Sequence, residues 1–121
     1  MQKVSLDVLI IEEDKHWRQI FQQELERLGA KTTVADSSIA ALNLARKKNY
    51  DMYISGGIMF CHRLKEIRPD ANILLVPGQY HEMQYANMPQ DVSYITKGQF
   101  SKVIYNHVQT SHEKKTSKGK A

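Results

Sequence analysis

The sequence predicts an α/β fold in which a five-stranded parallel sheet carries helices on both faces. The chain has 121 residues, of which 41% are hydrophobic and 25% are charged, enough for one ordinary core and too few for two. Short aliphatic runs alternate with helical periodicities along the whole chain. Two of these runs are uninterrupted, which is typical of strands buried on both faces.

The first strand is expected at 8–11, where Val-Leu-Ile-Ile forms one of the uninterrupted runs. The helix that follows has apolar residues at spacings of three and four. Asp14 is suited to cap the start of this helix, and Gly29 is suited to follow its end. A short second strand is expected at 31–35.

Ser37 or Ser38 is expected to cap the second helix, which has four candidate inward residues: Ile39, Ala41, Leu42 and Ala45. The third strand is expected around 52–54 and ends at two glycines. The third helix is expected at 58–67, with four inward residues: Ile58, Cys61, Leu64 and Ile67.

The fourth strand is expected at 73–76, where Ile-Leu-Leu-Val is the other uninterrupted run. The next segment has the weakest pattern, with a short helix expected at 81–85. A fifth strand is expected at 92–96. The final helix is indicated by four apolar residues: Phe100, Val103, Ile104 and Val108.

These units predict a three-layer, doubly wound sheet. Right-handed crossovers leave few arrangements, and the flavodoxin-like strand order 2-1-3-4-5 is the commonest for this length. In such sheets the functional crevice lies outside the carboxyl ends of the strands. The residues to consider are those that directly follow strands one, three, four and five: Glu12, Glu13, Ser55, Gly56, Gly57, Pro77, Gly78, Thr96, Lys97 and Gly98.

The net charge of +4 is concentrated at one end of the chain. Residues 110–121 contain four lysines and one glutamate, and they are almost free of apolar side chains. The remaining residues are close to neutral. The sequence therefore predicts one domain over 1–109 and a basic, disordered tail or linker over 110–121.

Several classes of protein are excluded by the composition. The longest apolar run is four residues, too short for a transmembrane helix, and the first seven residues show no secretory signal. The one cysteine, Cys61, excludes an internal disulfide. No histidine pair has the spacing of a metal site, and no glycine-rich phosphate loop is present. We expect a cytoplasmic domain without a cofactor.

Four segments resemble the receiver domains of response regulators, the CheY-like family, over residues 5–109. Val-Leu-Ile-Ile-Glu-Glu-Asp (8–14) is similar to the first strand and acidic cluster of that family. Tyr-Asp-Met-Tyr-Ile (50–54) resembles the strand that leads to its phosphorylated aspartate. Glu-Ile-Arg-Pro-Asp (66–70) and Tyr-Ile-Thr-Lys-Gly (94–98) resemble the end of its third helix and its fifth strand. The resemblance implies a role in two-component, phosphorelay signalling.

In that family an aspartate accepts a phosphoryl group beside a divalent metal ion, and a lysine and a Thr or Ser respond to it. By register, the acidic pair is Glu12 and Glu13 and the lysine is Lys97. The acceptor position falls on Gly56, and the Thr/Ser position falls on Pro77. The segment after Gly56 is also shorter than is usual in the family.

These departures predict a pseudo-receiver that is not an enzyme, because glycine has no nucleophile and proline has no hydroxyl. Two remaining carboxylates are a poor ligand set for Mg²⁺, so we expect the Lys97 ammonium to pair with Glu12 or Glu13 instead. A residual metal or small-ligand site is the alternative. Asp51 lies at the far end of its strand, and Ser55 is expected to point away from the pocket, so neither replaces the acceptor.

Receiver domains usually signal through the face made by the fourth helix, the fifth strand and the fifth helix. In this chain that face is rich in Tyr and Met, which interfaces favour: Tyr80, Met83, Gln84, Tyr85, Met88, Tyr94, Tyr105 and His107. The sequence therefore predicts a protein partner, namely a histidine kinase, a regulator, an effector domain or a second copy of the chain. The alternative is that the tyrosines only cover the core.

Two other functions remain open. One is an active receiver that is phosphorylated at an unanticipated residue. The other is a nucleic-acid-binding module that uses the lysine-rich tail, whose binding would weaken steeply with salt. Otherwise no nucleic-acid or membrane partner is expected, unless an attached domain supplies one.

Overall fold

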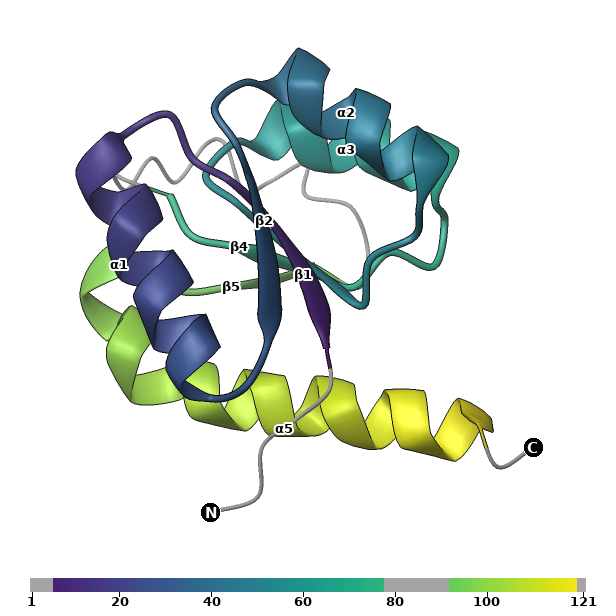
Figure 1. Ribbon diagram of the computed structural model, residues 1–121. Coiled ribbons are helices and arrows are strands. Elements are labelled where there is room, and N and C mark those ends of the chain that lie inside the picture. Colours follow the sequence, from purple (N-terminus) through teal and green to yellow (C-terminus); the bar gives the residue numbers. More distant parts are fainter. Residues whose placement is uncertain (1–5, 78–91, 120–121) are drawn as a thin grey trace.

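The computed structural model describes residues 6–77 and 92–119, and the predicted parallel sheet is confirmed (Figure 1). Its strands lie in the order β2-β1-β3-β4-β5, and every neighbouring pair is parallel. The strands are β1 (Asp7–Ile11), β2 (Lys31–Ala35), β3 (Met52–Ser55), β4 (Ile73–Leu75) and β5 (Val92–Tyr94). The carboxyl ends of β1, β3 and β4 therefore meet at one edge.

The helices form the two outer layers (Figure 1). α1 and α5 cover one face of the sheet, and α2 and α3 cover the other. Their bounds are α1 (Lys15–Arg27), α2 (Ser38–Lys47), α3 (Ile58–Ile67) and α5 (Phe100–Gly119), with a 3₁₀ turn, η1 (Lys97–Gln99), before α5.

The core has two halves because successive strand residues point to opposite faces. In β1, Val8 and Ile10 pack under α1 and α5, whereas Leu9 and Ile11 pack under α2 and α3. The first half is completed by buried side chains from both of its helices: Phe21, Leu25, Phe100, Ile104 and Val108. The second half is completed in the same way: Ala41, Leu42, Ala45, Phe60, Cys61 and Leu64. Burial on both faces explains why the central strands are continuous aliphatic runs.

The residues that were predicted to cap the start of α1 and α2, and to follow the end of α1, are confirmed in these positions. The Asp14 carboxylate accepts hydrogen bonds from the backbone N–H groups of His16 and Trp17 at 2.9 and 3.3 Å. The Ser37 hydroxyl accepts from the Ala40 N–H at 3.2 Å, so Ser37 is the cap of α2. Gly29 follows α1 with φ of 99°, a left-handed conformation that favours glycine.

The expectation that Ile39 points inward is wrong. Ile39 is 72% exposed, whereas Ala41, Leu42 and Ala45 are buried as predicted. At 3.6 residues per turn, Ile39 lies roughly a third of a turn from the centre of this stripe, so it misses the sheet. In α3 the buried stripe includes Phe60 in addition to the predicted Cys61 and Leu64.

Residues 110–119, for which the sequence predicts a disordered tail, are helical and continue α5. Ser111 is buried, and its hydroxyl accepts a hydrogen bond from the Asn72 side-chain amide at 2.8 Å. Lys115 forms an ion pair with Asp51 at 3.0 Å. Composition alone failed here because the docking groups are polar, and polar residues were counted as evidence for disorder.

None of the helices within the described ranges has the length and hydropathy of a membrane span.

Candidate functional site

The carboxyl ends of β1 and β3 and the start of η1 surround a pocket of about 240 Å³. The structure thus brings together the predicted acidic pair, the predicted lysine and the glycines after β3. The lining residues are Ile11, Glu12, Glu13, Ser38, Ser55, Gly56, Gly57 and Lys97. Most of the polar groups come from the turns directly after strands, which is where a doubly wound sheet places its functional crevice.

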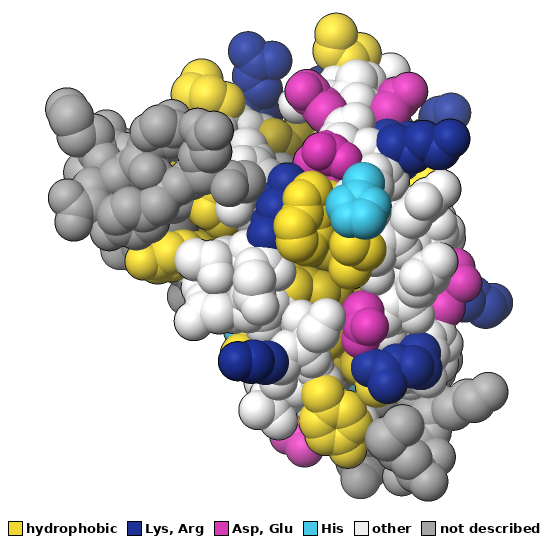
Figure 2. Space-filling view, turned by 90° about the vertical axis from the view of Figure 1, so that its left-hand side faces the viewer, with side chains coloured by type: hydrophobic (Ala, Val, Ile, Leu, Met, Phe, Trp, Pro, Cys, Tyr) yellow, Lys and Arg dark blue, Asp and Glu magenta, His cyan; other side chains and the backbone are white. Residues whose placement is uncertain are grey.

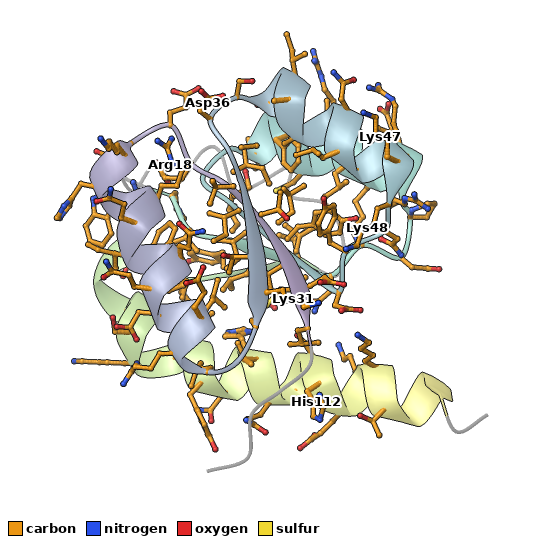
Figure 3. All side chains as sticks on the ribbon, viewed as in Figure 1. Arg18, Lys31, Asp36, Lys47, Lys48 and His112 are labelled. Atoms are coloured by element: carbon orange, nitrogen blue, oxygen red, sulfur yellow. The ribbon has the colours of Figure 1, made fainter. Side chains whose placement is uncertain are left out.

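Glu12 is the buried acid of the pocket, with 9% of its side chain exposed. Its Oε1 atom accepts hydrogen bonds from the Asp14 backbone N–H at 3.1 Å and from Lys97 Nζ at 3.4 Å. The Arg18 guanidinium extends from α1 and donates to the Glu12 backbone carbonyl at 3.0 Å (Figure 3). These contacts fix the Glu12 carboxylate and tie the end of β1 to the first turn of α1. By contrast, Glu13 is exposed.

Lys97 is the cation of the pocket, and the predicted pairing with the acidic pair is confirmed, with Glu12 as its partner. Only 14% of the Lys97 side chain is exposed. Its ammonium also lies 5.3 Å from the centre of the Trp17 ring, in the range of a cation–π contact. A capping box between Thr96 and Gln99 sets the position of η1 and therefore of Lys97.

Gly56 occupies the position that corresponds to the phosphorylated aspartate in the resemblance. A Cβ atom at Gly56 would lie 3.3 Å from the Val76 carbonyl oxygen and 3.5 Å from Glu12 Oε2. Position 56 therefore faces the Glu12 carboxylate across the pocket, and it presents only backbone there. Residue 56 itself therefore supplies no nucleophilic side chain.

Ser55 lines the pocket, contrary to the expectation that it points away from it. The turn after β3 explains the difference, because the Ser55 Oγ accepts a hydrogen bond from the Gly57 N–H at 3.0 Å. The hydroxyl is thus held against the backbone of the Gly56–Gly57 turn. Pro77 follows β4, is half-buried and is not among the residues that line the pocket.

Two further residues considered in the sequence lie away from the pocket. Asp51 is at the opposite end of β3, as predicted, where its carboxylate accepts from the Asp7 N–H at 2.8 Å and from Lys115. Cys61 is buried in α3, and burial raises the pKa of its thiol to about 11.

Within 6–77 and 92–119, no three His, Cys, Asp or Glu side chains are grouped so as to hold a metal ion.

The predicted interaction face is described only in part. Tyr94 on β5 and Tyr105 on α5 are 43% and 42% exposed, so neither is a core residue. His107 is half-buried on α5, and burial lowers its pKa. The other members of this face lie outside the described residues, as does the short helix expected at 81–85: Tyr80, Met83, Gln84, Tyr85 and Met88.

Sequence reasoning missed the contact between the Trp17 ring and the Lys97 ammonium. Its spacing assigned it to the core stripe of α1, and it does pack against the core while remaining partly exposed. Its ring also supports Lys97. The available signal was its position three residues after the Asp14 cap, which places Trp17 in the first turn of α1 beside the end of β1.

No known family model matches the sequence, and no curated protein matches it. The similarity to solved structures is nevertheless extensive. The receiver domain of an HD domain-containing protein from Pseudomonas fluorescens Pf-5 is 17% identical, with a TM-score of 0.81 over 99% of this chain and 95% of that chain. A response regulator receiver protein from Sinorhizobium medicae WSM419 is also 17% identical, with a TM-score of 0.79 over 90% of this chain and 95% of that one.

NtrX from Brucella abortus is 14% identical, with a TM-score of 0.72 over 94% of this chain. The chain spans only 30% of the length of NtrX. At these identities the comparisons show the fold: five parallel strands in the order 2-1-3-4-5 with helices on both faces, as in receiver domains of the CheY-like type.

Proposed function

We propose that the chain is a pseudo-receiver: a signalling domain of a two-component-like system that is not phosphorylated and acts by binding another protein. The observation that carries this proposal is Gly56, which places backbone where phosphoryl transfer needs a carboxylate. Pro77 adds to it, because a proline cannot follow a phosphoryl group with a hydroxyl. The domain catalyses no reaction and requires no cofactor.

The ion pair between Lys97 and Glu12 supports a pocket that keeps one conformation instead of switching between two. In the absence of an acceptor carboxylate, Lys97 has both a counter-ion and an aromatic ring within reach. The Glu12 carboxylate is in turn fixed by the Asp14 N–H. A charge network satisfied in this way has no need of a phosphoryl group or a metal ion to complete it.

The partner is expected to be a histidine kinase, a regulator or an effector domain in the cytoplasm. Two features support a protein partner. The exposed rings of Tyr94 and Tyr105 are of a type that interfaces favour. The similar fold in Pseudomonas fluorescens belongs to a protein with an HD domain, and NtrX is a much longer chain. A second copy of the chain is the other candidate, which sedimentation over a range of concentrations detects.

The phosphorylation half of the proposal is tested with acetyl phosphate and Mg²⁺, followed by intact mass. A receiver domain that retains its aspartate serves as the positive control. We expect no phosphoryl adduct on this chain under conditions that modify the control. A stoichiometric adduct that maps to an Asp or Glu would show instead that the chain is an active receiver with an unanticipated acceptor.

The interaction half is tested by substituting Tyr94→Ala and Tyr105→Ala in the full chain, with Lys102→Ala as an exposed control on α5. Each tyrosine variant should weaken partner binding by tenfold or more, with thermal unfolding nearly unchanged. If the two variants unfold, the tyrosines are structural. If they bind normally and removal of 110–121 abolishes a salt-sensitive binding, the nucleic-acid alternative is correct.

A further inference from the structure

The sheet has an open edge along β2. Among the described strands, β2 is the end strand and pairs with β1 alone. The backbone groups of Lys31 and Ala35 form hydrogen bonds on the β1 side. Because the direction of these groups alternates along a strand, the N–H and C=O groups of Thr32 and Val34 face away from β1.

An edge of this kind is a template for a further strand. β2 is five residues long and contains neither a proline nor a bulge, which are two of the devices that block edges in other proteins. Figure 1 shows β2 at the front of the molecule between α1 and α2, with no described element in front of it. The edge is therefore accessible to an extended chain.

A groove of about 280 Å³ runs beside this edge. It has walls from helices on both faces of the sheet, and the end of β2 lies between them. The lining residues are Arg18 of α1, Val34, Ala35 and Asp36 at the end of β2, and Ala40 and Leu44 of α2. A strand added to the sheet would lie about 4.8 Å from β2 and would occupy this groove.

A second copy of β2 satisfies this edge when it runs antiparallel to the first. With Thr33 of the two copies opposite each other, Thr32 of each copy faces Val34 of the other. Both residues direct N–H and C=O groups outward, so the two pairs form four hydrogen bonds. Thr33 lies between them and directs its own groups toward β1, as the non-hydrogen-bonded pair of an antiparallel ladder requires.

The charges on the α1 side match in the same register. Glu26 accepts a hydrogen bond from Thr32 Oγ1 at 2.8 Å, whereas Arg18 lines the groove beside Val34. Since position 32 of one copy faces position 34 of the other, Glu26 of each copy faces Arg18 of the other. Figure 2 shows basic and acidic side chains next to one another on the α1 face, so two copies do not meet with charges of one sign.

The charges on the α2 side match as well. Figure 3 shows Lys31 and Asp36 at opposite ends of β2, and neither takes part in an ion pair of the described residues. Ala35 packs in the core half under α2 and α3, so Lys31, four residues earlier in the strand, points to the same side. In the antiparallel register Lys31 of one copy lies opposite Ala35 of the other. Its stem then covers the half-buried Ala40 and Leu44, and its ammonium lies near Asp36.

We propose that two copies of the chain associate by antiparallel pairing of their β2 edges, which joins two five-stranded sheets into one continuous sheet. The backbone groups of Thr32 and Val34 form the ladder, and Lys31 and Asp36 set its direction. This inference goes beyond the proposed function and does not require it. The surface lies at the opposite edge of the sheet from β5, so pairing does not cover the face that carries Tyr105.

The first test is sedimentation of the full chain from about 10 μM to about 1 mM, because a small interface of this kind is weak. We expect an equilibrium between monomer and dimer. Val34→Pro removes the outward N–H and should weaken association by about tenfold or more. Val34→Thr keeps that N–H and is the matched control. The Val34 N–H does not bond to β1, so Val34→Pro should stay folded, which circular dichroism verifies.

A charge reversal tests the direction of the pairing. Lys31→Glu should weaken association, because it places a second carboxylate near Asp36 of the other copy. The double variant Lys31→Glu/Asp36→Lys should restore it. Loss of folding cannot produce such a restoration, so this test stands even if Val34→Pro unfolds.

Thr33→Cys tests the register. In a non-hydrogen-bonded antiparallel pair the two Cα atoms are about 4.5 Å apart, which is within the range of a disulfide. Oxidation by copper–phenanthroline should link two copies of Thr33→Cys into a dimer that dithiothreitol separates. Met59→Cys, exposed on α3, is the control and should stay unlinked. The native Cys61 is buried and does not compete.

Three outcomes overturn the inference. A parent chain that stays monomeric at the highest concentration leaves the β2 edge to an extended segment of another protein. A dimer that Tyr105→Ala disrupts and Val34→Pro leaves intact has its interface on α5. A dimer in which Thr33→Cys does not link has another register. None of these results bears on phosphorylation, and a phosphoryl adduct would overturn the proposed function while leaving the β2 pairing intact.

Discussion

Asp51 and Lys115 form an ion pair of 3.0 Å that joins the start of β3 to the last part of α5. The same Asp51 oxygen accepts a hydrogen bond from the Asp7 N–H, so one carboxylate links two strands and a helix. The last buried apolar residue of α5 is Val108. Beyond it, polar contacts from Ser111 and Lys115 hold the helix on the sheet.

We expect Asp51→Ala to release this part of α5 while leaving the core intact. Backbone amides at 111–116 should exchange with deuterium faster, and the free energy of unfolding should fall by about 1 kcal/mol. Glu113→Ala removes an exposed carboxylate from the same helix and is the control. Unchanged exchange in Asp51→Ala would show that the ion pair does not hold the helix.

Lys97→Met keeps the aliphatic stem over Trp17 and removes the ammonium. Because Glu12 then stays buried without its cation, we expect stability to fall by about 1–2 kcal/mol in urea unfolding. In a double-mutant cycle with Glu12→Gln, the coupling energy should be about 1 kcal/mol. A coupling near zero would mean that the contact at 3.4 Å adds nothing to stability.

Gly56→Asp tests whether the pocket tolerates the missing carboxylate. The new charge would lie beside Glu12 Oε2, so we expect Gly56→Asp to be less stable than Gly56→Ala by about 2 kcal/mol. Millimolar Mg²⁺ should stabilise Gly56→Asp and leave Gly56→Ala unchanged, because only the aspartate adds a metal ligand.

The control for this series is Gly57→Ala, where the nearest atom to a new Cβ is the Ser55 Oγ at 4.0 Å. It should be close to the parent chain in stability. If Gly56→Asp matches Gly56→Ala without Mg²⁺, the Glu12 carboxylate does not face position 56 in solution.

His107 predicts a pH dependence of stability on the acid side. Burial lowers its folded pKa below the usual 6.5, so the unfolded chain binds the proton first as the pH falls. The contribution of His107 to the free energy of unfolding should therefore be constant above about pH 6.5. It should decrease as the pH falls below that value. In His107→Gln that component should disappear, as measured by urea titrations at pH 7.5 and at pH 5.5. An identical slope in both proteins would exclude His107 as its source.

The sheet was predictable because its central strands, β1, β3 and β4, are buried on both faces and therefore leave a clear apolar signal. Asp14, Ser37 and Gly29 were equally informative, since each has a local reason for its position. Ile39 was wrongly predicted to be buried because it lies next to the buried stripe of a short helix. Spacing alone does not show whether such a residue faces the sheet or the solvent.

The site was predictable as a set of strand ends with an ion pair between Lys97 and one of the two glutamates, but its other contacts were not. Register alone brought Glu12, Gly56 and Lys97 together, yet the choice of Glu12 over Glu13 depends on which residue is buried. The cation–π contact of Trp17 and the docking of Ser111 depend on tertiary geometry between residues far apart in sequence. No local pattern encodes them.

Glu12 and Lys97 are 85 positions apart, which has a consequence for biosynthesis. At ribosomal speeds of about 5–20 residues per second, the carboxylate is synthesised roughly 4–17 seconds before its ammonium. In that interval β1 can already pair with β2 and β3, its two neighbours in the sheet. Until Lys97 is synthesised, the Glu12 carboxylate therefore lacks the cation that pairs with it in the folded chain.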